Sequence, residues 1–148
     1  MQVKDKDDMK ACVKKGYPVM KHIENIALPN GLRLDVWDAS RRIAADTTKV
    51  ELVIKMKVPF ASAHFDAEDH YLKTRRVFGP EGTYEYRKER TFVNNADTDR
   101  VFAELLGDFK RDALPYLVRE DFPRRFSRSK YREIVNNWYQ YRHLFENG

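Results

Sequence analysis

Cysteine and long apolar runs are nearly absent from this sequence of 148 residues. Cys12 is the single cysteine, which excludes an internal disulfide and a zinc site built from several cysteines. Aliphatic runs reach only three residues, as at 52–54, whereas a helix that crosses a bilayer needs about 20 apolar residues. We therefore expect no membrane-spanning segment and no membrane partner.

An apolar targeting segment is also missing. Residues 1–16, MQVKDKDDMKACVKKG, alternate charges where a secretory signal requires a continuous apolar stretch. A single cysteine is consistent with a reducing compartment. We therefore expect a cytoplasmic protein.

Glycine and proline are few, with six residues of each, and hydrophobic residues make up 42% of the chain. This composition excludes a low-complexity or intrinsically disordered chain. The length is that of one ordinary domain, and no repeat or linker interrupts the sequence. We predict that residues 1–148 form a single domain.

The signature motifs of the common enzyme classes are missing too. The sequence contains no G-x-S-x-G, no G-x-x-x-x-G-K and no G-x-G-x-x-G. Lys10 and Lys14 could favour a reactive thiolate at Cys12, but its place on the inner face of a short predicted helix favours an inert, packed thiol. We predict a non-catalytic protein without a cofactor and leave enzymatic activity open.

Several short segments alternate apolar and polar residues with period two, which is typical of strands with one buried face. Asn30-Gly31 supplies the positive φ of a tight hairpin, and Asp38-Ala39-Ser40 is typical of an Asx or ST turn that closes another. The pattern predicts an antiparallel β-meander sheet of four to five strands. The segments are residues 20–28, 32–38, 41–46, 49–58 and 83–93.

Other segments carry helical patterns. We expect a peripheral helix over 5–15, a second over 66–78 that ends before Gly79, and a third from Asp97 or Thr98 to near Pro115. A final helix is predicted from Ser127 or Ser129 towards Phe145. The fold class is therefore α+β, with helices packed on one face of the sheet and a C-terminal half that is mainly helical.

The same periodicities predict which side chains form the core. Tyr84, Tyr86 and Phe92 are expected on one side of the strand at 83–93. A single face of the strand at 49–58 should be buried, comprising Val50, Leu52, Ile54, Met56 and Val58. The final helix should bury a continuous stripe comprising Tyr131, Ile134, Val135, Trp138, Tyr141 and Phe145, with Tyr139 outside it.

The segment AHFDAEDHY concentrates side chains that bind metal ions, including His64 and His70. On a helix these two histidines would lie roughly 240° apart around the axis. Asp66 and Asp69 are better explained as residues that cap the helix at 66–78. We therefore predict no metal site.

The positive charge of the chain is concentrated in one segment. Residues 119–132 hold six basic and two acidic residues, a net charge of +4 in a chain whose total is +5. With the final helix beginning at Ser127 or Ser129, Lys130 and Arg132 would lie in its first turn, where positive charge is unfavourable. The candidate anion- or partner-binding residues are Arg124, Arg125, Arg128, Ser129, Lys130 and Arg132.

Two explanations of this basic segment remain open. Its charges could be compensated by Glu120, Asp121, or acids of the preceding helix such as Asp108 and Asp112. Alternatively, an anion could occupy the helix end. In that case sulfate or phosphate should stabilise the protein more than chloride, and changing Arg125 and Arg128 to Glu should remove the difference.

The leading functional hypothesis is a non-catalytic binding module that recognises an anionic partner through residues 119–132. That partner could be an acidic protein segment, a phosphate ligand or nucleic acid. A second hypothesis is a small enzyme or ligand carrier with a pocket between the sheet and the C-terminal helix. A third is a nucleic-acid-binding protein in which aromatic and basic residues act together.

Overall fold

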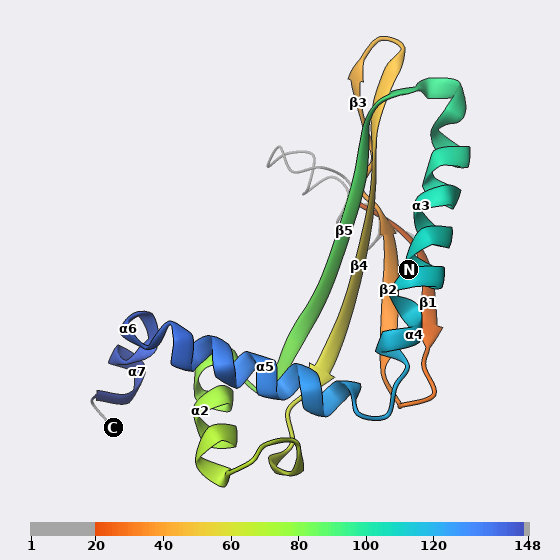
Figure 1. Ribbon diagram of the computed structural model, residues 1–148. Helices are drawn as coiled ribbons and strands as arrows, with labels where there is room; N and C mark the ends of the chain where they lie inside the picture. Colours follow the sequence, from red (N-terminus) through yellow and green to blue (C-terminus); the bar gives the residue numbers. More distant parts are fainter. Residues whose placement is uncertain (1–19, 147–148) are drawn as a thin grey trace, which may run out of the picture. The chain divides into compact units, whose positions relative to one another are not determined.

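The computed structural model describes residues 20–146 (Figure 1), so Cys12 and the predicted helix at 5–15 lie outside the described residues. Contacts within the chain define two compact units. Unit 1 contains the described residues up to Ile26 together with Leu34–Lys55 and Glu85–Leu114, and unit 2 contains Ala27–Arg33, Met56–Tyr84 and the described residues from Pro115. Both units draw on the same two long strands, and the single domain stays a prediction.

The sheet is antiparallel and has five strands, as predicted. Strand β4 is hydrogen-bonded to β2, β3 and β5, and β1 pairs with β2. Helices follow in the C-terminal part, which confirms the α+β class. The strands are β1 (Lys21–Ala27), β2 (Arg33–Asp38), β3 (Arg41–Ala44), β4 (Thr47–Pro59) and β5 (Glu81–Asn94).

Two short turns form as the sequence predicts. Gly31 has φ 89° between β1 and β2, a conformation that an L side chain disfavours. Beyond β2, the Ser40 amide donates to the Asp38 carboxylate at 2.9 Å, which is an Asx turn. The Ser40 hydroxyl then accepts a hydrogen bond from the Glu51 amide on β4.

Strand β4 carries the apolar residues predicted to form the core. Its predicted face is buried along the whole strand, and Val53 on the opposite face is buried as well. The buried residues of that face are Val50, Leu52, Ile54, Met56 and Val58. Removal of these side chains from water is the main favourable contribution of this strand to folding.

The prediction that Phe92 faces the core with Tyr84 and Tyr86 is wrong. Phe92 is 81% exposed, whereas Val93 is buried. Phe92 has φ 58°, which interrupts the extended backbone. Because side chains alternate between faces only in regular strand, this single residue transfers the buried position from 92 to 93.

In unit 1, helix α3 (Thr98–Asp112) packs on the sheet through one apolar stripe. Val101, Leu105 and Phe109 are buried, and the Phe109 ring lies 4.9 Å from the ring of Tyr86 on β5. Burial, followed by the charges of Asp108 and Asp112, raises the pKa of the Tyr86 hydroxyl.

In unit 2, helix α5 (Phe122–Asn136) lies beside α2 (Glu68–Phe78), as Figure 1 shows. The Phe122 ring contacts Tyr84 on β5 edge-to-face at 6.0 Å. The remaining short helices are α4 (Leu114–Leu117), α6 (Trp138–Tyr141) and α7 (His143–Glu146), with 3-10 turns η1 (Ser62–His64) in unit 2 and η2 (Asn95–Asp97) in unit 1. Among the described residues, no helix has the length and apolar character needed to cross a membrane.

Helix ends differ from the predictions at three places. Asp66 does not cap α2, whose N-cap residue is Ala67, although the helix does end at Phe78 before Gly79 with φ 87°. Helix α5 begins at Phe122 rather than at Ser127 or Ser129. The predicted continuous final helix is broken after Asn136 into α5, α6 and α7.

Candidate anion-binding site

The start of α5 determines which arginines lie near the positive end of the helix. Asp121 is the N-cap residue and Pro123 lies in the first turn, a position where proline is favourable because its missing N–H is not needed. Arg124 and Arg125 are therefore the basic residues of the first turn, and Lys130 and Arg132 lie further along the helix. The sequence Asp-Phe-Pro was the signal for this start.

The start of α5 is also held by a distant turn. Asn30, in the turn between β1 and β2, donates through its side-chain amide to the carbonyl oxygens of Leu117 at 2.8 Å and Arg119 at 2.9 Å. These two hydrogen bonds from Asn30 set the position of the helix N-terminus in unit 2. Ser127, predicted as the N-cap residue of the final helix, is instead fully buried within α5.

Five of the six candidate residues line one hollow of about 470 Å³, which we call the arginine hollow. Arg124, Arg128 and Arg132 are spaced four residues apart, so their side chains lie on one side of the helix. Tyr116 of α4 completes the wall. The lining residues are Tyr116, Arg124, Arg125, Arg128, Ser129 and Arg132.

Two of the four arginines already hold carboxylates. Arg125 donates from Nε to Asp121 at 2.8 Å, and Arg119 donates to the same carboxyl group at 3.0 Å. These two hydrogen bonds lower the pKa of Asp121 to about 2, so it stays ionised at neutral pH. Arg128 donates to Asp66 at 3.2 Å.

Arg124 and Arg132 form no ion pair with any other described residue. Both are exposed in the arginine hollow. Asp108 and Asp112, considered from the sequence as compensating acids, lie beside Arg111 of their own segment instead. The compensation expected from Asp121 therefore exists for Arg125 but not for these two arginines.

Lys130 lies outside the arginine hollow. Its ammonium group is 3.4 Å from Glu133 and stands over the rings of Phe78 at 5.1 Å and Phe126 at 5.6 Å. The structure thus separates Lys130 from the other candidate residues. A helix of 3.6 residues per turn places position 130 on a different side from 124, 128 and 132.

His64 lies close enough to Arg124 to be influenced by its charge. Burial, followed by the positive charge of Arg124, lowers the pKa of His64 below its ordinary value of 6.5. The buried Nδ1 atom of this ring has no hydrogen-bond partner among the described residues. The neutral imidazole is therefore the favoured form beside the arginines.

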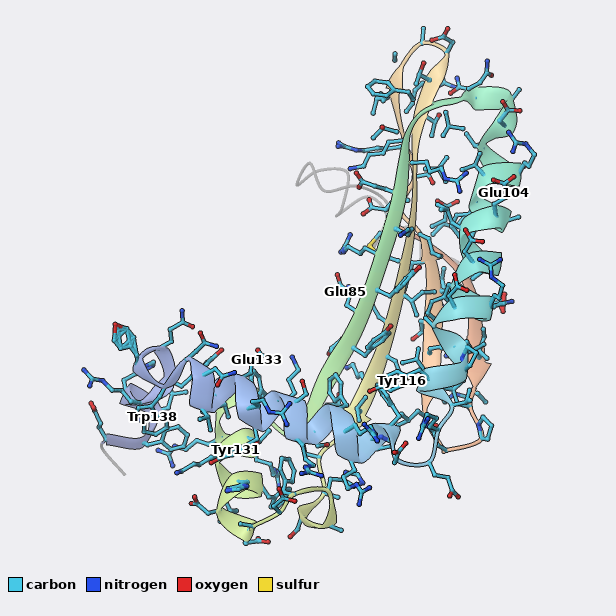
Figure 2. The ribbon with its side chains drawn as sticks, viewed as in Figure 1. Glu85, Glu104, Tyr116, Tyr131, Glu133 and Trp138 are labelled. Atoms are coloured by element: carbon cyan, nitrogen blue, oxygen red, sulfur yellow. The ribbon has the colours of Figure 1, made fainter. Side chains whose placement is uncertain are left out.

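A second hollow of about 250 Å³, which we call the aromatic hollow, adjoins the first because Arg128 and Arg132 line both. His70 of α2 and Tyr131 of α5 are stacked there with ring centroids 4.0 Å apart and an interplanar angle of 12°. Figure 2 shows Tyr131 on the side of α5 that faces α2. The other lining residues are Phe65, Asp66 and Val135.

Sequence reasoning missed most of the aromatic hollow. Its residues come from two segments about 60 positions apart, and nothing local in either segment indicates that they meet. His64 and His70 were considered as metal ligands, but the described residues contain no group of three or more His, Cys, Asp or Glu side chains arranged to hold a metal ion.

Comparison with other proteins adds no further assignment: the chain matches no protein-family model, no curated protein and no solved structure. The geometry of unit 2 is therefore the basis on which a function is inferred.

Proposed function

We propose that this chain is a non-catalytic binding module that holds an anionic group, such as a phosphate, in the arginine hollow. The observation that carries this proposal is the convergence of four arginines on one hollow in which Arg124 and Arg132 lack a carboxylate partner among the described residues. Guanidinium groups present several N–H donors in a planar fork that matches phosphate and carboxylate oxygens.

The position of Arg124 strengthens the argument. It lies in the first turn of α5, where the helix dipole makes a positive charge unfavourable by about 0.3–1 kcal/mol at low ionic strength. The carboxylate of the N-cap residue Asp121 is held by Arg119 and Arg125, and no acidic residue lies in the first turn itself. An anion beside Arg124 would interact favourably both with the guanidinium group and with the helix end.

The hydroxyl groups in the same hollow add neutral donors. Ser129 is exposed on α5, and Tyr116 is 47% exposed on α4. Each hydroxyl can donate one hydrogen bond to an oxyanion. The hollow therefore combines positively charged guanidinium groups with neutral hydroxyl donors that can fix the orientation of a bound anion.

The test compares phosphate binding by the wild-type protein with binding by a double variant, Arg124→Gln with Arg132→Gln. Titration of millimolar phosphate at constant ionic strength avoids the general stabilisation that high concentrations of phosphate give to any protein. Loss of two charged hydrogen-bond donors should raise the Kd for phosphate about tenfold or more.

Lys130→Gln is the control because it removes one positive charge from the same helix outside the hollow, against two charges in the double variant. Its Kd for phosphate should stay within about twofold of the wild-type value, because Lys130 does not line the hollow and its ammonium group already lies beside Glu133. If Lys130→Gln weakened phosphate binding as much per charge removed as the double variant does, net charge alone would explain the effect and the proposal would be contradicted.

A further inference from the structure

The two hollows of unit 2 form one continuous surface along α5. Arg128 and Arg132 line both, with Arg124 on the side of the arginine hollow and Val135 on the side of the aromatic hollow. Eleven residues separate Arg124 from Val135, which corresponds to about 16 Å along the helix axis. One ligand can therefore contact both hollows with chemically different ends.

The aromatic hollow offers flat surfaces for an aromatic ring. His70 and Tyr131 already form a nearly parallel stack, and Phe65 lines the same hollow. Each ring of the stacked pair is only partly buried. Nucleobases bind such rings by stacking, and guanidinium groups such as those of Arg128 and Arg132 also stack on bases.

The charges of the lining residues determine which hollow favours a phosphate and which favours a base. Asp66 lines the aromatic hollow, and its carboxylate repels a phosphate there but can accept hydrogen bonds from the N–H groups of a base. The arginine hollow contains no carboxylate among its lining residues. The favourable orientation therefore places the phosphate on Arg124 and the ring on Tyr131.

We infer that the anion held by the arginine hollow is the phosphate of a nucleotide whose unpaired base occupies the aromatic hollow. This inference rests on the proposed function and specifies the ligand class. The nucleotide is either free or part of a single strand, because in both forms the base is available for stacking. A base inside a duplex is not, since its faces are covered by neighbouring bases.

The first experiment compares each of the four ribonucleoside triphosphates with inorganic triphosphate, whose charge is similar. At least one nucleotide should bind about tenfold tighter than triphosphate, because the base adds stacking. Equal affinity for triphosphate and all four nucleotides would overturn this inference and leave the proposed function standing. No binding of triphosphate, nucleotide or phosphate would overturn both.

Variants of Tyr131 test whether the higher affinity for a nucleotide than for triphosphate comes from the aromatic hollow. Tyr131→Ala should lower the nucleotide affinity to that of triphosphate while the triphosphate affinity stays unchanged, and Tyr131→Phe should keep the gain. Tyr139→Ala is the matched control, because Tyr139 is 71% exposed on α6 and lines neither hollow. A nucleotide preference that survives Tyr131→Ala would contradict the assignment of the base.

A final comparison distinguishes the two sources of the nucleotide. A mixed-sequence single-stranded RNA that binds more tightly than the best free nucleotide identifies a strand as the ligand, and weaker binding identifies the free nucleotide. A duplex of the same sequence should bind more weakly than the single strand. Tighter binding of the duplex would indicate recognition of the backbone alone and would contradict the inference.

Discussion

Arg128 and Asp66 form a hydrogen-bonded ion pair at 3.2 Å although 62 residues separate them in the chain. The pair links α5 to the segment that precedes α2, and both residues line the aromatic hollow. Arg128 also lines the arginine hollow. An anion that binds there must therefore compete with the Asp66 carboxylate for the guanidinium donors.

This competition predicts that removing the charge of Asp66 strengthens anion binding. Asp66→Asn should lower the Kd for phosphate by about 1.5-fold to fivefold, since exposed ion pairs contribute about 0.2–1 kcal/mol. The effect is opposite in sign to that of the arginine variants and is measurable by calorimetric titration. Weaker binding in Asp66→Asn would mean that Asp66 positions Arg128 rather than competing for it.

His64 should make stability depend on pH. Because burial and Arg124 lower its pKa in the folded state, the unfolded chain binds more protons as the pH falls below about 6.5. The stability that the neutral ring contributes is complete above that pH and is lost as the pH falls through the lower, folded-state pKa. Urea unfolding at pH 7.5 and 5.5 measures the loss.

His64→Gln should reduce this pH dependence, and the same substitution at the exposed His143 serves as the control. Bound phosphate should also raise the pKa of His64, because the negative charge of the phosphate offsets the positive charge of Arg124. Titration of the His64 ring followed by NMR, with and without phosphate, tests this coupling. An unchanged midpoint at saturating phosphate would place the anion away from Arg124.

Gly82 is required where β5 meets α5. A Cβ atom at this position would lie 2.8 Å from Cε2 of Phe126 and 2.9 Å from Cζ of Phe60. Gly82→Ala should lower the free energy of unfolding by about 1–3 kcal/mol, because overpacking forces the packed rings of Phe60 and Phe126 to move. The control is Gly107→Ala on α3, where a Cβ meets nothing within 4 Å and should stabilise the helix. Urea denaturation of both variants gives the comparison.

The unusual backbone at Phe92 should reverse an ordinary preference of strands. At φ 58° the backbone conformation is favourable for glycine and strained for a β-branched residue. The Phe92→Gly variant should therefore be more stable than the Phe92→Val variant by about 1 kcal/mol or more. At the neighbouring exposed Thr91, whose φ is not positive, the valine variant should be the more stable one. The same order at both positions would argue against the left-handed conformation.

Local pattern was sufficient to predict the strands of the sheet and their buried face. Val50, Leu52 and Ile54 occupy every second position along β4, and apart from Val53 the positions between the buried residues are polar, so the register with that face buried is the favourable one. The turn at Gly31 and the helix end before Gly79 were also predictable from the sequence, because the φ values of 89° and 87° that these glycines adopt are unfavourable for other residues. The concentration of positive charge in residues 119–132 was visible in the sequence as well.

The sequence by itself determined the character of each segment: which residues alternate, where the chain turns and where basic charge accumulates. Tertiary structure decided which of these charges share a hollow. Arg124 shares it with Arg132 because α5 begins at Phe122 rather than at Ser127 or Ser129, whereas the helical period directs Lys130 towards Phe78. It also decided that Asp66 meets Arg128 and that His70 stacks on Tyr131. Periodicity describes one segment at a time, whereas these contacts depend on how α2 and α5 pack, and that packing is set by the shapes of all the side chains between them.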